Sequence, residues 1–147
     1  MTGLRVERGL LQLLVAFACL VPLTVGTMGI LHGPDWLKGV GADVPRDLDS
    51  HFRYLSGVFL GVGIAFASCI PRIEATGSRF RMLAAFVFLG GLSRLFSLAQ
   101  VGAPSGGHQF GLVMELLVTP GLMLWQASYA RRLGRANGAL PGRGNAP

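Results

Sequence analysis

Four long apolar segments, separated by short polar connectors, set the pattern of this sequence. A helix needs about 20 mostly apolar residues to cross the ~30 Å hydrocarbon core of a bilayer. Four segments have approximately this length, and they cover residues 10–31, 52–70, 82–101 and 110–130. The connectors carry Gly, Pro, Asp or basic residues, as turns and loops do. The pattern predicts an all-α fold, a four-helix transmembrane bundle that runs up-down-up-down within residues 1–132.

The composition supports a membrane domain. Of the residues, 51% are hydrophobic and only 14% are charged, whereas soluble domains carry about 25% charged residues. So few charges could not cover a water-facing surface around so much apolar material, and the lipid bilayer is the expected partner of the outer faces. Residues 133–147 carry Arg, Gly and Pro and are predicted to form a disordered cytoplasmic tail.

The basic residues predict the orientation, because cytoplasmic loops of membrane proteins carry an excess of Lys and Arg. Nine arginines fall on one side of a four-span topology: Arg5, Arg8, Arg72, Arg79, Arg81, Arg131, Arg132, Arg135 and Arg143. On the other side, Lys38, Arg46 and Arg53 are offset by four aspartates. Both termini are therefore expected in the cytoplasm, with the chain a multi-pass protein of the cell inner membrane. A cleaved signal peptide is the alternative for the first segment, but its apolar run is longer than the usual one.

Two charged residues, Arg94 and Glu115, interrupt the third and fourth segments. A charge at the bilayer centre costs about 2.5–3.5 kcal/mol on insertion scales, so each needs a partner. Arg94 lies eight residues before Gly102, and Glu115 lies seven after His108. At 1.5 Å per residue both lie roughly 10–12 Å inward from the same outer loop. We therefore expect a buried Arg94–Glu115 ion pair between adjacent helices; a pair that only specifies helix packing is the alternative to a functional one.

Further polar residues are expected near the outer leaflet. Asp49 or Ser50 would be the N-cap of the second helix, which would place His51 and Arg53 at the interface. The outer polar cluster predicted above the ion pair consists of Asp49, His51, Arg53 and His108. Such a cluster could contact a small anionic ligand or a lipid headgroup.

Glycines and prolines mark the expected packing positions. Small residues let a neighbouring helix approach closely, and this role is assigned to Gly57, Gly61, Gly90 and Gly91. Packing within one chain and association into a homo-oligomer explain them equally well, so the oligomeric state stays open. Pro120, near the middle of the fourth segment, is expected to kink the helix, or else to be an ordinary tolerated membrane proline.

Several classes of function lack the residues they need. The arginines occur in short clusters without interleaved aromatic residues, which argues against nucleic-acid binding. The two cysteines lie in separate apolar runs without a Cys/His cluster, so we expect no metal site. With no nucleophile motif and no phosphate loop either, no cofactor and no enzymatic activity are expected.

Three strings carry a resemblance to a known family. They are LDSHFRYLSGVFLGVGI (48–64), FLGGLSRLFSLAQVGAP (88–104), and Glu115 followed by Pro120. Together they resemble a bacterial family catalogued as domain of unknown function 4345, over about residues 8–132. The resemblance implies a small four-helix membrane protein and no particular activity. The residues that match its polar and glycine signature are Asp49, His51, Arg53, Gly57, Gly90, Gly91, Arg94 and Glu115.

Three functions are consistent with these residues. The first is a small binding or scaffold bundle with a polar cluster near the outer leaflet. The second is a small transporter that acts as a dimer, although Arg94 would oppose the proton exchange that such a carrier needs from Glu115. The third is a membrane-embedded enzyme that uses His51 with Asp49 or Glu115 as an acid/base pair. We favour the first.

Overall fold

The structure is a computed structural model that describes residues 2–41 and 43–138, and within these ranges it contains helices and turns but no strand. The α-helices are α1 (Thr2–His32), α2 (Arg46–Ala67), α3 (Gly77–Val101), α4 (Gly106–Val113) and α5 (Thr119–Gly138). A π-helical turn, η3 (Met114–Val118), joins α4 to α5 in one continuous helical rod. Short 3-10 turns, η1 (Gly33–Trp36) and η2 (Ile70–Arg72), follow α1 and α2. The predicted all-α architecture is confirmed.

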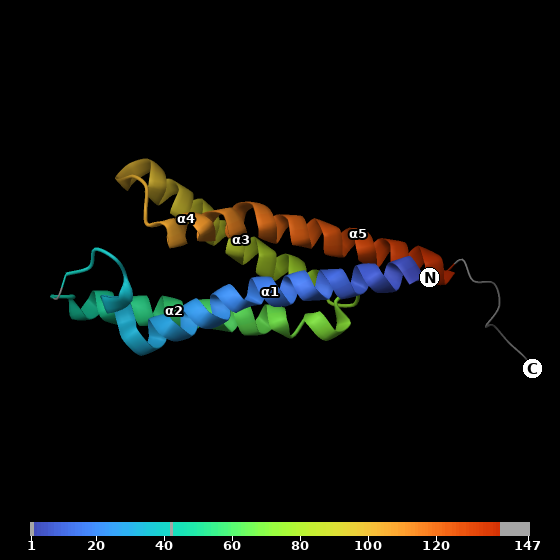
Figure 1. Ribbon diagram of the computed structural model, residues 1–147, viewed down its shortest axis with the longest axis horizontal. Helices are drawn as coiled ribbons and strands as arrows, with labels where there is room; N and C mark the ends of the chain where they lie inside the picture. Colours follow the sequence, from blue (N-terminus) through green and yellow to red (C-terminus); the bar gives the residue numbers. More distant parts are fainter. Residues whose placement is uncertain (1, 42, 139–147) are drawn as a thin grey trace, which may run out of the picture.

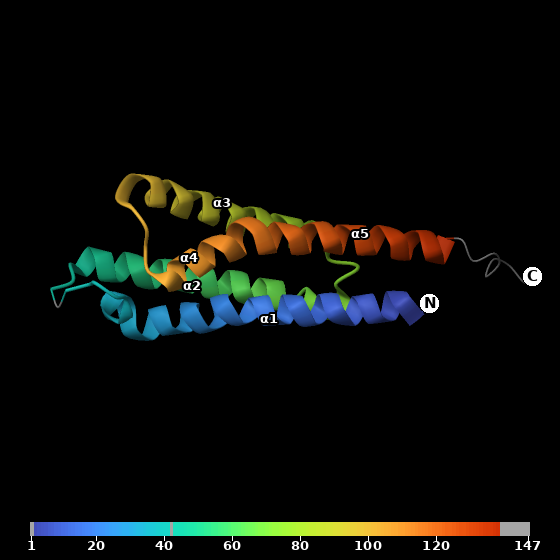
Figure 2. The same cartoon turned by 45° about the horizontal axis from the view of Figure 1, so that its top comes forward.

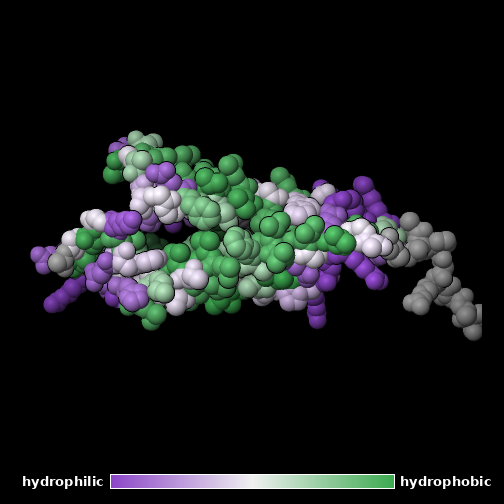
Figure 3. Space-filling view, viewed as in Figure 1, coloured by the Kyte–Doolittle hydropathy of each residue, from purple (hydrophilic) through white to green (hydrophobic). Residues whose placement is uncertain are grey.

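Four helical rods are long and apolar enough to cross a membrane: Thr2–Trp36, Arg46–Arg72, Gly77–Val101 and Gly106–Gly138. Their outer faces carry large apolar side chains, and Phe17, Phe96 and Leu117 are each about two-thirds exposed. Figure 3 shows this apolar surface along the middle of the molecule, with hydrophilic residues gathered towards its ends. Such a surface needs lipid rather than water around it. The chain is therefore a multi-pass membrane protein.

The helices extend beyond the predicted apolar segments. The second begins at Arg46, directly after Pro45, so Asp49 and Ser50 lie inside α2 and neither is its N-cap. Asp47 and Asp49 in the first turn favour this start because they face the positive end of the helix dipole. At the other end of the chain α5 continues to Gly138, so residues 133–138 are helical and not part of a disordered tail. Residues 139–147 of the predicted tail lie outside the described ranges.

The rods form two pairs, with α1 against α2 and α3 against the α4–η3–α5 rod (Figures 1 and 2). The start of α1, the end of α5 and the α2–α3 connection lie at one end, which we call the closed end. The opposite end holds the α1–α2 and α3–α4 connections, and there α3 diverges from α2. We call it the split end, and Figure 3 shows it hollowed below the end of α3.

The hydrophobic core lies between the closed end and the middle of the bundle. Its buried side chains are Leu11, Val15, Cys19, Phe66, Cys69, Ile73, Phe80, Leu83, Ala84 and Tyr129. Phe66 and Phe80 meet edge to face, with ring centroids 5.0 Å apart. All four rods contribute to this core, which therefore holds the two helix pairs together.

Candidate functional site

Glu115 lies in the π-helical turn between α4 and α5. Pro120 has no N–H to donate, and its ring crowds the carbonyl one turn earlier, which disrupts the regular α-helical hydrogen bonds at this point. Here the helix widens: both the backbone N–H and the Oγ1 of Thr119 donate to the carbonyl of Met114, the latter at 2.9 Å. π-turns are rare and occur often at functional sites. Next to Pro120, where a kink or an ordinary tolerated proline was expected, the structure has a wider turn that carries the buried carboxylate.

Arg94 on α3 meets this carboxylate. Its Nε donates to Glu115 Oε1 at 3.0 Å, and Glu115 Oε2 lies 3.0 Å from the same nitrogen. Oε2 is buried and makes no hydrogen bond within the described part of the chain. The two residues therefore lie at one level on neighbouring helices, as the depth comparison along the sequence requires.

Gly91 makes the close contact between α3 and the π-turn. A Cβ at this position would lie 2.7 Å from Leu116 Cδ2 and 2.9 Å from Glu115 Cβ, closer than real Cβ atoms approach. By contrast, a Cβ at Gly57, Gly61 or Gly90 would meet nothing within 4 Å. Of the four glycines assigned to helix packing, only Gly91 has that role within this chain.

Other glycines, which the sequence did not identify, make the close contacts between α1 and α2. A Cβ at Gly26 would lie 2.9 Å from the Leu60 backbone nitrogen, and one at Gly29 would lie 2.2 Å from Ser56 Oγ. A Cβ at Gly63 would lie 3.0 Å from Pro22 Cβ. Small residues occur on several faces of α1 and α2, and spacing alone does not say which face is inward.

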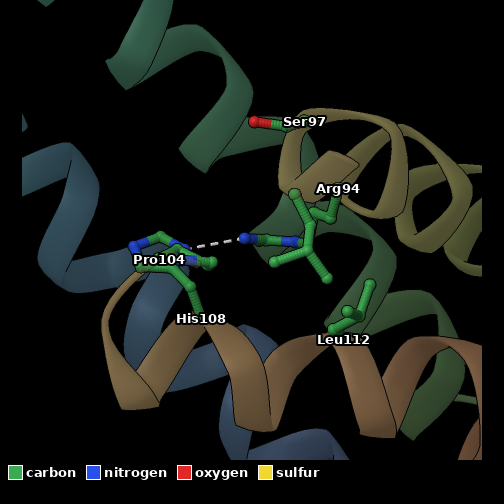
Figure 4. Close-up of a pocket in the computed structure, with 6 residues that line it drawn as sticks. Arg94, Ser97, Pro104, His108 and Leu112 are labelled. Carbon is green, nitrogen blue, oxygen red and sulfur yellow. Dashed lines mark hydrogen bonds between the residues drawn. The ribbon is translucent and has the colours of Figure 1, made fainter. Parts of the chain in front are cut away.

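His108 on α4 is the second partner of Arg94. Its Nδ1 lies 2.7 Å from Arg94 Nη1. A guanidinium can only donate, so Nδ1 must accept and the ring proton must be on Nε2. Figure 4 shows the Arg94 side chain reaching from α3 towards the His108 ring. Arg94 thus holds a buried carboxylate with one nitrogen and a neutral imidazole with another.

A pocket of about 110 Å³ lies beside this arrangement. Its lining residues are Arg94, Ser97, Leu98, Pro104, His108 and Leu112. The side chain of Arg94 is 39% exposed, whereas that of Glu115 is only 9% exposed. The carboxylate is therefore enclosed by protein, while the guanidinium also faces the pocket.

Asp49 and Arg53 form a separate cluster within the α1–α2 pair. Arg53 donates from Nε to Asp49 Oδ2 at 2.9 Å and from Nη2 to Asp49 Oδ1 at 3.1 Å. Its Nη1 donates to the carbonyls of Ile30 and Leu31, which are orphan acceptors at the end of α1. Gly33, at φ +66°, packs so closely that a Cβ would lie 2.5 Å from Asp49 Oδ1. Arg53 therefore caps α1.

The sequence predicts a single outer cluster, and this prediction is wrong because its members lie in separate groups. No hydrogen bond or ion pair among residues 2–41 and 43–138 joins the Asp49–Arg53 pair to Arg94, Glu115 or His108. His51 is exposed, and its ring centroid lies 6.5 Å from that of Tyr54. Of the four residues assigned to that cluster, only His108 joins the buried ion pair, because the Asp49–Arg53 pair is engaged at the end of α1.

A third polar group, at the closed end, was not predicted. Arg8 donates to Glu74 Oε2 at 3.0 Å and to the carbonyl of Pro71 at 2.8 Å. The hydrogen bond from Arg8 to Glu74 lowers the pKa of the Glu74 carboxyl below its usual value. Trp125 and Arg132 both donate to Glu7. Glu7 and Glu74 are the only acidic residues among the basic clusters, and this contrast of charge could have identified both.

Two glutamines complete this group by binding the α2–α3 connection. Gln12 donates to the carbonyl of Ile70, and the fully buried Gln126 donates to that of Ile73, each at 2.7 Å. These bonds satisfy backbone groups that the irregular connection leaves free. Across residues 2–41 and 43–138, no cluster of three His, Cys, Asp or Glu side chains could hold a metal ion.

A family model described as Domain of unknown function (DUF4345) matches residues 10–126. This chain belongs to that family. The match covers most of the chain and includes Arg94, His108, Glu115 and the whole π-turn. No curated protein and no solved structure matches the chain. The description of the DUF4345 family names no activity, so the chemistry of the site rests on its geometry.

Proposed function

We propose that this DUF4345 protein is a binding bundle of the inner membrane, in which Arg94 holds the anionic group of a small ligand or lipid headgroup. The proposal rests on the unequal exposure of the ion pair, 39% for the Arg94 side chain and 9% for that of Glu115. A pair that only locked two helices together would have no need to present its cation to a pocket. Here the buried carboxylate positions the guanidinium for a third partner.

The remaining donors of Arg94 define the chemistry of that partner. Nε is used by Glu115 and Nη1 by His108, while Nη2 makes no hydrogen bond to any residue of the described ranges. Free guanidinium N–H groups bind carboxylate or phosphate oxygens through charge-assisted hydrogen bonds. Ser97 adds a hydroxyl to the lining, and Leu98 and Leu112 add apolar surface. The site therefore suits an amphiphile with a small acidic head.

The size of the pocket limits what can enter it. Its volume of about 110 Å³ compares with the ~30 Å³ share of one molecule in liquid water. It can hold a headgroup of a few atoms, with any chain remaining outside. Because the split end, which contains the pocket, is hollowed below the end of α3 (Figure 3), such a chain has room to lie along the bundle.

The proposed orientation places this pocket towards the outer leaflet. Eight arginines and only two acidic residues of the described ranges lie in the helix ends and the connection at the closed end. By the excess of positive charge in cytoplasmic segments, that end and both termini would face the cytoplasm. The split end and the Arg94 pocket would then face outwards.

A transporter and an enzyme have less support. A proton-coupled carrier needs a carboxylate that water and substrate can reach, whereas Glu115 is buried and paired. An acid/base pair of His51 with Asp49 or Glu115 would need the residues in contact, but His51 is exposed and Asp49 pairs with Arg53. We therefore propose binding without catalysis.

The test is ligand binding by the full chain in a neutral detergent, followed by native mass spectrometry with decyl phosphate and decanoate as probes. Ser97→Leu would fill part of the pocket without replacing either residue of the ion pair, and Ser93→Leu is its matched control because Ser93 is exposed and outside the lining. We expect Ser97→Leu to lower affinity about tenfold or more, and Ser93→Leu to leave it unchanged. Equal binding by both variants and the wild type would show that the pocket is not the site.

A further inference from the structure

A second cavity, of about 200 Å³, lies at the closed end between the first turns of α1 and the last turns of α5. It is separate from the Arg94 pocket, which is at the split end, and it goes beyond the function proposed above. Its lining includes two arginines, a tyrosine and apolar side chains: Arg5, Arg8, Tyr129, Leu4, Leu133 and Ala136. Cationic and apolar groups thus share one small space.

The two arginines differ in what already holds them. Arg8 is fixed by Glu74 and the Pro71 carbonyl through Nε and Nη2, which leaves Nη1 without a partner in the described ranges. Arg5, one turn earlier on the same face of α1, is exposed and makes no hydrogen bond or ion pair to residues 2–41 and 43–138. The cavity therefore has one oriented guanidinium and one free guanidinium, and the free one can close over a bound anion.

Tyr129 adds a hydroxyl donor to the cavity. Its side chain lines the cavity, and its hydroxyl makes no hydrogen bond to any residue in the described part of the chain. The hydroxyl does not belong to the buried polar atoms that lack a partner, which are Glu115 Oε2 and Gln126 Oε1. It is therefore free to donate to a ligand oxygen in the cavity.

The position of the cavity along the bundle indicates the kind of ligand. Leu10 and Leu13 on α1 and Leu124 on α5 are exposed and apolar, as expected for side chains that contact lipid chains. The cavity begins within about two turns of them, which is the level at which the hydrocarbon gives way to headgroups. Leu4 and Leu133 extend the apolar surface into the cavity itself. A free phosphate would use the arginines but leave this apolar part of the lining unused.

We propose that this cavity binds the phosphate of an anionic phospholipid. Arg5 and the free Nη1 of Arg8 donate to the phosphate oxygens, the Tyr129 hydroxyl donates to a third oxygen, and Leu4 and Leu133 contact the glycerol end of the acyl chains. Basic pockets between transmembrane helices bind anionic headgroups in this way. The site adds a specific contact to the general attraction between the arginine-rich end and a negatively charged leaflet.

Native mass spectrometry of the full chain, titrated with phosphatidylglycerol in neutral detergent, tests the proposal. Arg5→Gln removes the free guanidinium and leaves the Arg8–Glu74 pair intact. Arg131→Gln removes a charge that is also exposed but lies outside the lining. We expect Arg5→Gln to weaken phosphatidylglycerol binding about tenfold relative to Arg131→Gln. Ala136→Phe, which fills the cavity without changing charge, should weaken it similarly, whereas Gly134→Phe at an open position should not.

The remaining arms separate the sources of phosphate. Phosphatidylcholine should bind more weakly than phosphatidylglycerol to the wild type, and this preference should disappear in Arg5→Gln and Ala136→Phe. Inorganic phosphate should not compete at millimolar concentration; if it did, with the same dependence on Arg5, the lipid assignment would be overturned. Equal losses in Arg5→Gln and Arg131→Gln would overturn the site itself. Ser97→Leu should leave phosphatidylglycerol binding unchanged, so failure here and failure of the Arg94 site can be told apart.

Discussion

The two ends of this bundle solve the same packing problem differently. At the closed end all four rods contribute to one core, and the connection between α2 and α3 is held by Arg8, Gln12 and Gln126. At the split end the close contacts shown by Gly29 and Gly91 are made within each helix pair, and α3 diverges from α2. The comparison indicates that one end carries the stability of the bundle while the other can open around a ligand.

The largest effect is expected in the core of the closed end. Phe80 is 1% exposed and contacts Phe66, so Phe80→Ala should lower the free energy of unfolding by about 3–5 kcal/mol through lost contacts and a cavity. Phe96, 68% exposed at the split end, is the matched position. Phe96→Ala should change the free energy of unfolding by less than about 0.5 kcal/mol. Unfolding of both variants in mixed micelles of neutral and ionic detergent measures the difference. Similar losses at the two positions would remove the distinction between the ends.

The second-largest effect is expected at the Arg94–Glu115 ion pair. Glu115→Leu leaves Arg94 without its counter-charge and should cost about 2–3 kcal/mol, less than for a fully buried pair because the Arg94 side chain is partly exposed. The double variant Arg94→Leu/Glu115→Leu should recover most of this stability, since no unpaired charge remains. The same micelle titration gives both values. A double variant no more stable than Glu115→Leu would mean that the pair itself contributes directly to the fold.

Two adjacent glycines provide a finer comparison within α3. Gly91→Val would drive a side chain into Leu116 and Glu115 and should cost about 1–3 kcal/mol. Gly90→Val adds the same atoms on an open face, and helix propensity makes it neutral or slightly stabilising. Thermal unfolding of the two variants, side by side, checks the assignment. Equal destabilisation would place Gly90 in a contact with a second copy of the chain.

The smallest effect is electrostatic and depends on pH. Because Arg8 lowers the pKa of Glu74 below its ordinary 4.5, the pair stabilises the fold above that pH and loses this contribution as pH falls through the lowered value. Both side chains are about a third exposed, so solvent screening limits the contribution to about 0.5–1 kcal/mol. The difference in stability between wild type and Glu74→Gln should therefore be present at pH 7 and decline as the pH falls from 4.5 through the lowered pKa. A difference that persisted at acid pH would have another origin.

The sequence was sufficient for the helices and for the ion pair. Apolar length identifies a membrane span, and counting residues from a shared loop places Arg94 and Glu115 at one depth. The rotation of each helix about its own axis was harder to predict from the sequence. Apolar side chains are favoured both against lipid and in the core, and the helices lack a clear polar face. Gly57, Gly61 and Gly90 were therefore assigned to helix packing, within the chain or between copies, although a Cβ at each would meet nothing within 4 Å. The prediction that Arg53 and Arg94 share one cluster was wrong for a related reason. The number of residues from a loop gives the depth of a side chain, but not the helix pair that it contacts.

The π-turn has a consequence for how this site can vary. A π-turn amounts to one residue more than an α-helix of the same length requires, and each residue of a helix turns the chain by about 100°. If the same residues formed a regular α-helix instead, as replacement of Pro120 would permit, α4 would turn around its axis by about that angle relative to α5. His108 would then leave Arg94 even though every contacting side chain was still encoded. The register between His108 and Pro120 is thus as much a part of the binding chemistry as the identity of either residue.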